Sequence, residues 1–158
     1  MSKGYIAFDN DNQLPSLTTP HGSCYISTPA ATTITVAGTF YLLEGTTSAI
    51  SNSLFTHSSP GRLTYNGAIP KDFFVTASMS FVSNSNNILA SIRVAKNGET
   101  IAASEQSFFK ATAADEKQVS SFIVLQLAQN DYIELYVTND AAGSTITANH
   151  AIMVVNCI

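Results

Sequence analysis

The sequence feature that most constrains the fold of this chain is the stretch Leu125–Asn139, together with the turn Lys96–Glu99. Leu125–Asn139 contains an apolar strand, a four-residue polar turn and a second strand that alternates strictly between two faces, which predicts one hairpin. The turn contains Asn97-Gly98, the dipeptide that best fits a tight two-residue hairpin, because both central positions need a positive φ. Together the two patterns predict an antiparallel all-β sandwich.

Further strand-like runs recur at short spacing and are separated by turn residues. In Phe73–Val82, one face carries Phe73, Val75, Ala77, Met79 and Phe81, and the other carries Thr76, Ser78 and Ser80. No segment has a sustained helical period, and Ala111–Lys117 is at most one turn. Short strands at this spacing predict a two-sheet jelly-roll sandwich. The predicted strands are Cys24–Ser27, Thr33–Val36, Gly38–Leu43, Arg62–Tyr65, Phe73–Val82, Ile88–Ala95, Thr100–Ser107, Val119–Leu127, Tyr132–Thr138 and Thr145–Asn156.

A length of 158 residues supports one sizeable core, so we expect one domain, preceded by an irregular arm. Residues 1–20 contain a run of Asp and Asn, two prolines and little periodicity. Their main apolar side chains are Tyr5, Ile6 and Phe8. We therefore expect an N-terminal arm at residues 1–20 and a jelly-roll domain at residues 21–158.

The composition is poor in charge and rich in small polar residues. Charged residues make up 11% of the chain, where about 25% is usual, and 19 Ser, 17 Thr and 12 Asn replace them. The net charge is −4 and the basic residues are scattered, which argues against nucleic acid. No run approaches the length of a membrane span, and Met1–Gly4 begins no signal-peptide core. We therefore expect no membrane partner and synthesis in a host cytoplasm.

The two cysteines, Cys24 and Cys157, are too few for a disulfide framework. Two buried, reduced thiols fit cytosolic synthesis. A single bridge is the alternative if the first and last strands lie side by side.

No catalytic or metal-binding pattern stands out. His21, His57 and His150 are far apart and lack the spacing of zinc ligands. Asp9–Asn12 supplies the first oxygen ligands of a calcium loop, but the glycine and glutamate needed at its sixth and twelfth positions are missing. No Gly-x-Ser-x-Gly elbow or phosphate-binding glycine loop is present. We therefore expect no metal, no cofactor and no enzymatic activity.

Two of the strand-like runs, Phe122–Leu125 and Ala151–Val155, are apolar at every position. A strand with one face in the core and one in water alternates, whereas a strand buried on both faces does not. The outer face of such a strand must be covered, either by a loop of the same chain or by another subunit. The sequence leaves both alternatives open.

The order of motifs along roughly residues 33–158 is that of a known fold. An aromatic and aliphatic strand at Phe40–Leu43 precedes a Pro-Gly turn into Leu63–Gly67, followed by a Pro-led strand at Pro70–Val82. A Lys-Asn-Gly hairpin, Asn130–Val137 and a final apolar strand complete the series. This order resembles the jelly roll shared by the complement one-q globular head and tumour necrosis factor, especially its phage and metagenomic virion versions.

The most specific part of the resemblance is Leu127 followed by Asp131–Leu135. It is similar to that family's element of a leucine, a glycine-aspartate pair and alternating aliphatic residues. Asn130 stands where glycine is common, and asparagine can adopt the same left-handed turn.

The resemblance implies a homotrimer in which aromatic and aliphatic side chains near the threefold axis contact one another. On this basis we expect Tyr132, Tyr136, Met153 and Val155 at the trimer interface. Tyrosine suits such contacts because it buries a large area while keeping a polar tip. Ordinary packing under a loop is the alternative for each of the four residues.

Two functions follow from this interpretation. The first is a virion protein that decorates or cements a capsid shell, anchored on the major capsid protein through Tyr5, Ile6 and Phe8. The second is the head of a tail or head fibre that binds a host surface glycan or protein. A secreted cytokine-like ligand is a third, less favoured possibility. The polar loops expected to bind the host are Gly45–Ser59, Ser83–Asn87 and Asn139–Ser144.

Overall fold

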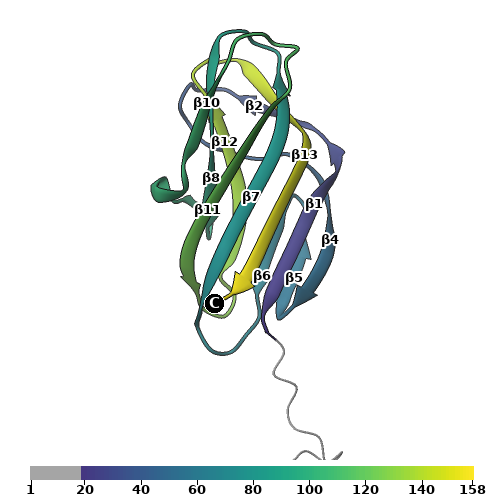
Figure 1. Cartoon of the computed structure of the whole chain (residues 1–158), viewed down its shortest axis with the longest axis vertical. Helices are drawn as coiled ribbons and strands as arrows, with labels where there is room; N and C mark the ends of the chain where they lie inside the picture. The colour runs from purple at the N-terminus through teal and green to yellow at the C-terminus, as the bar shows by residue number, and fades with distance from the viewer. Residues whose placement is uncertain (1–18) are drawn as a thin grey trace, which may run out of the picture.

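Strands pair in the antiparallel direction throughout residues 19–158, the part of the chain that the computed structural model describes (Figure 1). The predicted all-β, antiparallel two-sheet jelly roll is confirmed. The helical content of this part is one short 3-10 turn, η1 (Ala102–Ser104). The strands are β1 (His21–Pro29), β2 (Ala31–Ile34), β3 (Tyr41–Leu42), β4 (Gly45–Ser53), β5 (Phe55–Ser58), β6 (Arg62–Tyr65), β7 (Lys71–Ser83), β8 (Ile88–Lys96), β9 (Glu99–Thr100), β10 (Gln106–Lys110), β11 (Lys117–Leu127), β12 (Tyr132–Asn139) and β13 (Ser144–Cys157).

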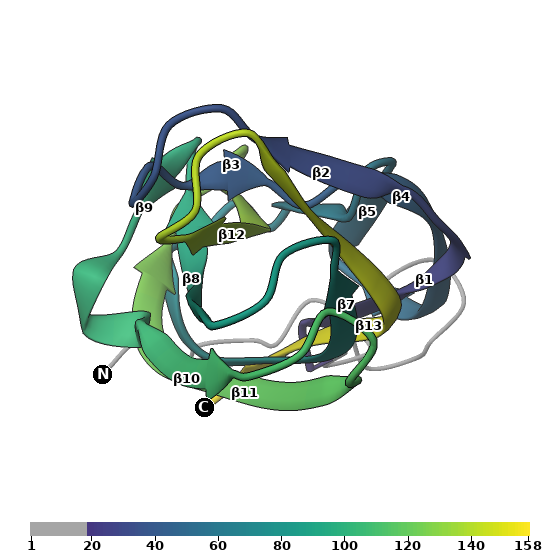
Figure 2. The ribbon, with the colours of Figure 1, turned by 90° about the horizontal axis from the view of Figure 1, so that it is seen from above.

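The strands form two facing sheets. Sheet A has the order β11-β7-β13-β1-β4, with β2 paired to the upper part of β13. Sheet B has the order β10-β8-β12-β6-β5, with β3 paired to β12 and β9 to β8. Seen from above, the sheets enclose the core, and β10 and β11 lie side by side at one edge (Figure 2). The connections therefore cross repeatedly between the sheets, as a jelly roll requires.

The alternation of β7 places one row of its side chains in the core. Phe73, Val75, Met79 and Phe81 are all buried there. At the lower end, the ring of Phe73 lies 5.3 Å from that of Phe55 and 5.0 Å from that of Tyr65. These three rings also contact one another edge-on or tilted, which is the favoured arrangement for aromatic pairs.

The hairpin predicted at Asn97-Gly98 is confirmed. Lys96 faces Glu99 across the turn, and the two central residues have φ angles of 54° and 81°. These positive values are what a tight hairpin turn demands and what Asn-Gly accepts at little cost. The positive φ of 70° at Asn130 likewise confirms that asparagine takes a left-handed turn there.

The prediction that Leu125–Asn139 forms one hairpin is wrong. β11 pairs with β7 in sheet A, and β12 pairs with β8 in sheet B. The turn between them is a corner that crosses from one sheet to the other. The Asp131 carboxylate stabilises this corner by accepting hydrogen bonds from the Ala128 N–H at 2.8 Å and the Asn97 side chain at 2.7 Å.

Two further segments differ from the sequence-based prediction. The expected loop Gly45–Ser59 forms β4 and β5. β4 is an edge strand made largely of Gly, Ser, Thr and Asn, so it lacks the alternating apolar residues that would have revealed it. In the expected strand Thr100–Ser107, η1 interrupts the extended backbone between β9 and β10.

The described chain begins just before β1, at Thr19. The predicted arm up to Thr18, with its anchor candidates Tyr5, Ile6 and Phe8, lies outside the described residues. Among residues 19–158 no helix is long and apolar enough to span a membrane.

Candidate functional site

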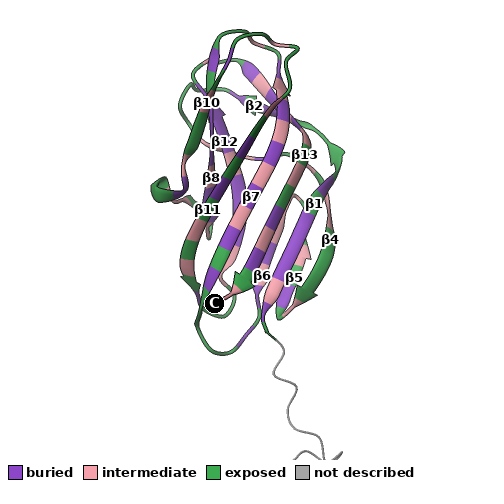
Figure 3. Cartoon of the chain, viewed as in Figure 1, coloured by how far each residue is buried: buried purple, intermediate pink, exposed green. Residues whose placement is uncertain are grey.

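The outer face of sheet A carries exposed apolar side chains in its lower half. Phe122 is 65% exposed, Val124 56% and Ile152 41%. In Figure 3, which views this face, much of β11 is green while β7 alternates between buried and less buried residues. We call this group of side chains the apolar patch. It consists of Tyr25, Phe74, Phe122, Val124, Ile152 and Val154.

The strand register brings these side chains together across four strands. Phe74 on β7 lies opposite Val124 on β11, and its ring centroid is 6.3 Å from that of Phe122. Ile152 on β13 lies opposite Tyr25 on β1. Val154 on β13 and Phe122 on β11 both lie opposite Thr76 on β7, so one threonine separates the two groups of the patch. Monomeric proteins rarely expose large apolar patches without an interaction to cover them.

Above the patch the same face becomes polar. The Ser80 hydroxyl donates to the Glu116 carboxylate at 2.6 Å, and the Asn149 amide donates to it at 3.1 Å. These hydrogen bonds, that from Ser80 first, hold the pKa of Glu116 below its usual value. The Ser120 hydroxyl also donates to that of Ser78 at 3.0 Å. The apolar patch therefore ends at a surface whose polar groups bond to each other.

Two of the four predicted interface residues are wrong. Met153 is 3% exposed and Val155 is fully buried, and both belong to the hydrophobic core between the sheets. The side chains that leave the core are their neighbours Ile152 and Val154. The run Ala151–Val155 is apolar at every position, so its sequence could not show which alternate residues face inward.

A matched pair of substitutions tests this assignment of faces. Val155→Ala should lower the free energy of unfolding by about 2 kcal/mol, because it removes two buried methyl groups and leaves a void. Val154→Ala makes the same change on the outer face and should cost under about 0.5 kcal/mol. Urea denaturation measures both. Equal losses would mean that the two faces of β13 are assigned incorrectly.

The other two candidates, Tyr132 and Tyr136, lie on the outer face of sheet B, away from the apolar patch. The guanidinium of Arg62 stacks over the ring of Tyr132 at 3.9 Å and pairs with the buried Glu134 carboxylate at 2.9 Å. Burial, followed by the nearby Glu134 charge, raises the pKa of the Tyr136 hydroxyl. The contact with Arg62 thus accounts for the half-buried state of Tyr132, and the role of both tyrosines at an interface remains a prediction.

A second arginine organises the rest of this face in the same way. Arg93 donates through Nε to Glu105 at 3.0 Å and stacks over the ring of Phe40 at 4.3 Å. Its hydrogen bond to Glu105 holds the pKa of that carboxyl below its ordinary value. Around these two arginines the outer face of sheet B is therefore polar and paired, and its exposed apolar pair is Leu89 and Phe109 on β8 and β10. The outer face of sheet A presents a larger group of apolar side chains. This contrast makes the apolar patch the stronger interaction surface.

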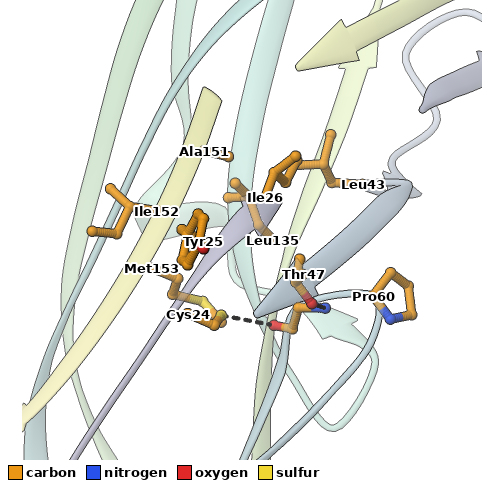
Figure 4. A pocket seen from close by; sticks show the side chains of 11 residues that line it. Cys24, Tyr25, Ile26, Leu43, Thr47, Pro60, Leu135, Ala151, Ile152 and Met153 are labelled. Carbon is orange, nitrogen blue, oxygen red and sulfur yellow. Dashed lines mark hydrogen bonds between the residues drawn. The ribbon is translucent and has the colours of Figure 1, made fainter. Parts of the chain in front are cut away.

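One small cavity lies beside β1, where Cys24, Ile26, Leu43, Leu135 and Met153 are among the lining residues (Figure 4). Its volume of about 30 Å³ is that of a single water molecule. It is a packing gap of the sandwich and too small for an organic ligand.

Both cysteines are free, and Cys24 is buried as predicted, whereas Cys157 is only partly buried. The first and last strands do lie side by side, but Cys24 is opposite Met153. Cys157 is four positions further along β13, roughly 13 Å away at about 3.3 Å per residue. A disulfide allows at most about 7 Å between Cα atoms.

The Cys24 thiol should be chemically inert in the folded protein. Its burial raises its pKa to about 12, and the thiol donates to the Gly61 carbonyl at 3.8 Å. Iodoacetamide at about pH 8 should therefore leave Cys24 unmodified until the protein unfolds, because the thiolate is the reactive form. Peptide mass spectrometry reads this out, with the same reaction in urea as control. Rapid native labelling of Cys24 would contradict the packing of β1.

Two of the three histidines, His21 and His57, take part in hydrogen bonds. His21 contacts the Ser51 hydroxyl through Nε2 at 3.0 Å, and His57 contacts that of Thr47 at 2.7 Å. Within the part of the chain that the structure describes, no three His, Cys, Asp or Glu side chains are grouped to hold a metal ion.

No protein-family model matches the chain, and no curated protein sequence matches it. Solved structures do resemble it. The globular domain of zebrafish complement 1qA protein matches with a TM-score of 0.51 at 13% identity, covering 88% of this chain and 97% of that one. Eiger TNF from S. frugiperda matches with a TM-score of 0.50 at 15% identity, covering 87% of this chain and 92% of that one. The likeness shows the fold alone, and it confirms the complement one-q and tumour-necrosis-factor type of jelly roll.

Proposed function

We propose that this protein is a trimeric structural component of a virion that decorates and stabilises the capsid shell. The observation that carries the proposal is the apolar patch on sheet A. The homotrimer and the capsid partner are the parts of the proposal that the resemblance of the sequence to virion members of the fold implies. The low charged fraction of 11% agrees with a surface built to pack against other proteins.

The patch favours assembly because covering it removes apolar area from water. Each large apolar side chain that becomes fully buried contributes about 1.5–3 kcal/mol. Phe122, Val124 and Ile152 are still 41–65% exposed in the single chain. Their burial against another subunit would offset the loss of freedom on association, which is the main cost of forming a trimer.

A closed trimer joins its subunits head to tail, so the patch of one subunit must meet a different surface of the next. Leu89 and Phe109 supply such a surface at the edge of sheet B. They are cross-strand partners on β8 and β10, and they are 47% and 60% exposed. This apolar pair is the counterpart that we assign to the patch.

Mixing two variants tests the head-to-tail contact. Ile152→Asp places a charge in the apolar patch, and Phe109→Asp places one in its counterpart. Each variant alone should therefore remain a single chain in sedimentation velocity. A mixture retains one intact contact between unlike chains and should form a two-chain species. If the mixture stays fully monomeric while the unmodified chain forms a trimer, Leu89 and Phe109 are not the counterpart.

The decoration role is tested by imaging purified particles that contain the protein. Trimers spread over the whole shell would support decoration of the capsid. A few copies confined to one vertex or to the tail would contradict it. Binding to purified capsids can be compared between the unmodified chain and a Tyr5→Asp, Phe8→Asp variant, which should bind less if these residues form the anchor.

A receptor- or glycan-binding head is the second candidate, and one observation favours it. Two of the three expected recognition loops, Ser83–Asn87 and Asn139–Ser144, lie together at the end opposite the start of β1 (Figure 1). The Asn84 side chain accepts a hydrogen bond from the Thr145 N–H at 2.8 Å, which links them. Glycan-array binding that is lost on changing these loops would support this alternative over decoration.

A further inference from the structure

β11 forms one edge of sheet A, and within residues 19–158 it pairs only with β7. The strand is 11 residues long, carries its one lysine at the first position and contains no proline. Proteins protect exposed edges with charges, prolines or bulges, because free N–H and C=O groups recruit further strands. At the lower end the Lys96 ammonium covers the outward carbonyl of Gln126, and further up the Ser121 hydroxyl donates to the Ser104 carbonyl of η1. The unprotected part of the edge is therefore Phe122–Leu125.

The direction of the free backbone groups follows from two hydrogen bonds. The Asp72 carbonyl accepts from the Ile158 N–H at 3.1 Å, so Asp72 directs its backbone groups towards β13. Its partner on β11, Gln126, therefore directs its own groups away from β7. The Lys96 ammonium accordingly donates to the outward Gln126 carbonyl at 2.9 Å.

Alternation along β11 gives Phe122 and Val124 the same outward direction as Gln126. Among the described residues no backbone group is bonded to the outward N–H or C=O of either residue. Their side chains belong to the apolar patch and are more than half exposed. This edge thus offers ladder hydrogen bonds and apolar contacts together, the two requirements for adding a strand.

We propose that residues 5–8 of the same chain, Tyr5-Ile6-Ala7-Phe8, add to this edge as a further strand of sheet A. The run is apolar throughout and lies between Gly4 and Asp9. In an extended conformation Ile6 and Phe8 share one face. On the added strand they can lie beside Phe122 and Val124 and extend the apolar patch.

Residues 9–18 are long enough to connect β1 to the free edge of β11, and β1 begins at the end of sheet A where β11 ends. Pro20 accepts a hydrogen bond from the Cys157 N–H at 3.0 Å, which fixes the start of β1 beside the end of β13. The last residues of β11 lie at this same lower end, opposite the first residues of β7. Crossing from β1 past β13 and β7 to β11 takes about 15 Å at about 4.8 Å per strand. Residues 9–18 can span about 33 Å when extended.

This inference concerns the single chain and does not depend on trimer formation. It does bear on capsid binding, because Tyr5, Ile6 and Phe8 cannot pair with β11 and contact a shell at once. A capsid site for these residues would have to compete with the edge of β11.

Amide hydrogen exchange of the full chain, followed residue by residue by NMR, tests the inference with an internal control. The outward amides of Phe122 and Val124 should be protected in the unmodified chain. In an Ile6→Asp, Phe8→Asp variant they should exchange about tenfold faster or more. The inward amides of Ile123 and Leu125, which bond to β7, should be unchanged. Leu14→Asp alters an apolar residue outside the run and should leave all four amides protected.

Three results would overturn the inference. The outward amides could exchange rapidly in the unmodified chain, or they could remain protected in the Ile6→Asp, Phe8→Asp variant. Protection in that variant that rises with protein concentration would identify a second copy of the chain as the occupant of the edge.

Discussion

An Ile152→Asp protein should remain folded and fail to form the trimer. Ile152 is 41% exposed on the outer face of β13, so a carboxylate there stays hydrated in the single chain. At an interface it would be an uncompensated buried charge, which costs about 3–5 kcal/mol. We expect the trimer to dissociate at concentrations at least about 100-fold higher than for the unmodified chain. Sedimentation velocity over a dilution series measures this.

Ile69→Asp is the matched control for this substitution. Ile69 is 68% exposed in the loop between β6 and β7, outside the apolar patch. The same chemical change should leave assembly unaltered there. Thermal melts of both variants check that each remains folded. If the Ile152→Asp variant forms the trimer as readily as the unmodified chain, the apolar patch does not lie in the trimer interface.

A Gly67→Ala protein should lose about 3–5 kcal/mol of stability, although the change adds a single methyl group. A Cβ at Gly67 would lie 2.0 Å from the Tyr65 hydroxyl oxygen and 2.2 Å from its ring carbon Cζ. The Tyr65 ring is 1% exposed and packs against Phe55 and Phe73. It must leave this site, so the cost approaches that of deleting a buried aromatic side chain. Its hydroxyl also loses the bond to the Ile69 carbonyl, now 2.9 Å long.

Gly143→Ala separates this clash from the general effect of replacing glycine. Gly143 has a φ of +73°, but no atom lies within 4 Å of an added Cβ. Its replacement should therefore cost only the backbone strain, about 1 kcal/mol. Guanidinium denaturation of both variants gives the comparison. Equal losses at the two positions would show that Tyr65 does not occupy the space beside Gly67.

The sequence predicted the features of the fold that local chemistry determines. Asn97-Gly98 specified its turn because few dipeptides accept two positive φ angles. Phe73–Val82 specified its faces because one set of alternate residues is apolar throughout, whereas the other contains Thr76, Ser78 and Ser80. The corner at Ala128–Asp131 was mistaken for a hairpin turn. A polar turn between two strands has the same composition whether the strands pair or enter different sheets, so long-range pairing decides the outcome.

The candidate surface was located only in part by sequence. The all-apolar runs Phe122–Leu125 and Ala151–Val155 correctly indicated strands whose outer faces carry apolar residues. Which alternate residues face outward depends on register with β7 and β1, and a run of uniform hydrophobicity carries no such information. Met153 and Val155 were therefore chosen where Ile152 and Val154 are exposed. Phe74, by contrast, could have been found, because it breaks the polar face of an otherwise alternating strand.

The central claim is that the apolar patch of sheet A joins identical chains into a trimer. Sedimentation equilibrium of the unmodified full chain at micromolar concentration tests it most directly. A mass of three times the 16.8 kDa chain mass is the expected result. A mass of one chain across the whole concentration range would contradict the claim and leave the patch without its proposed partner.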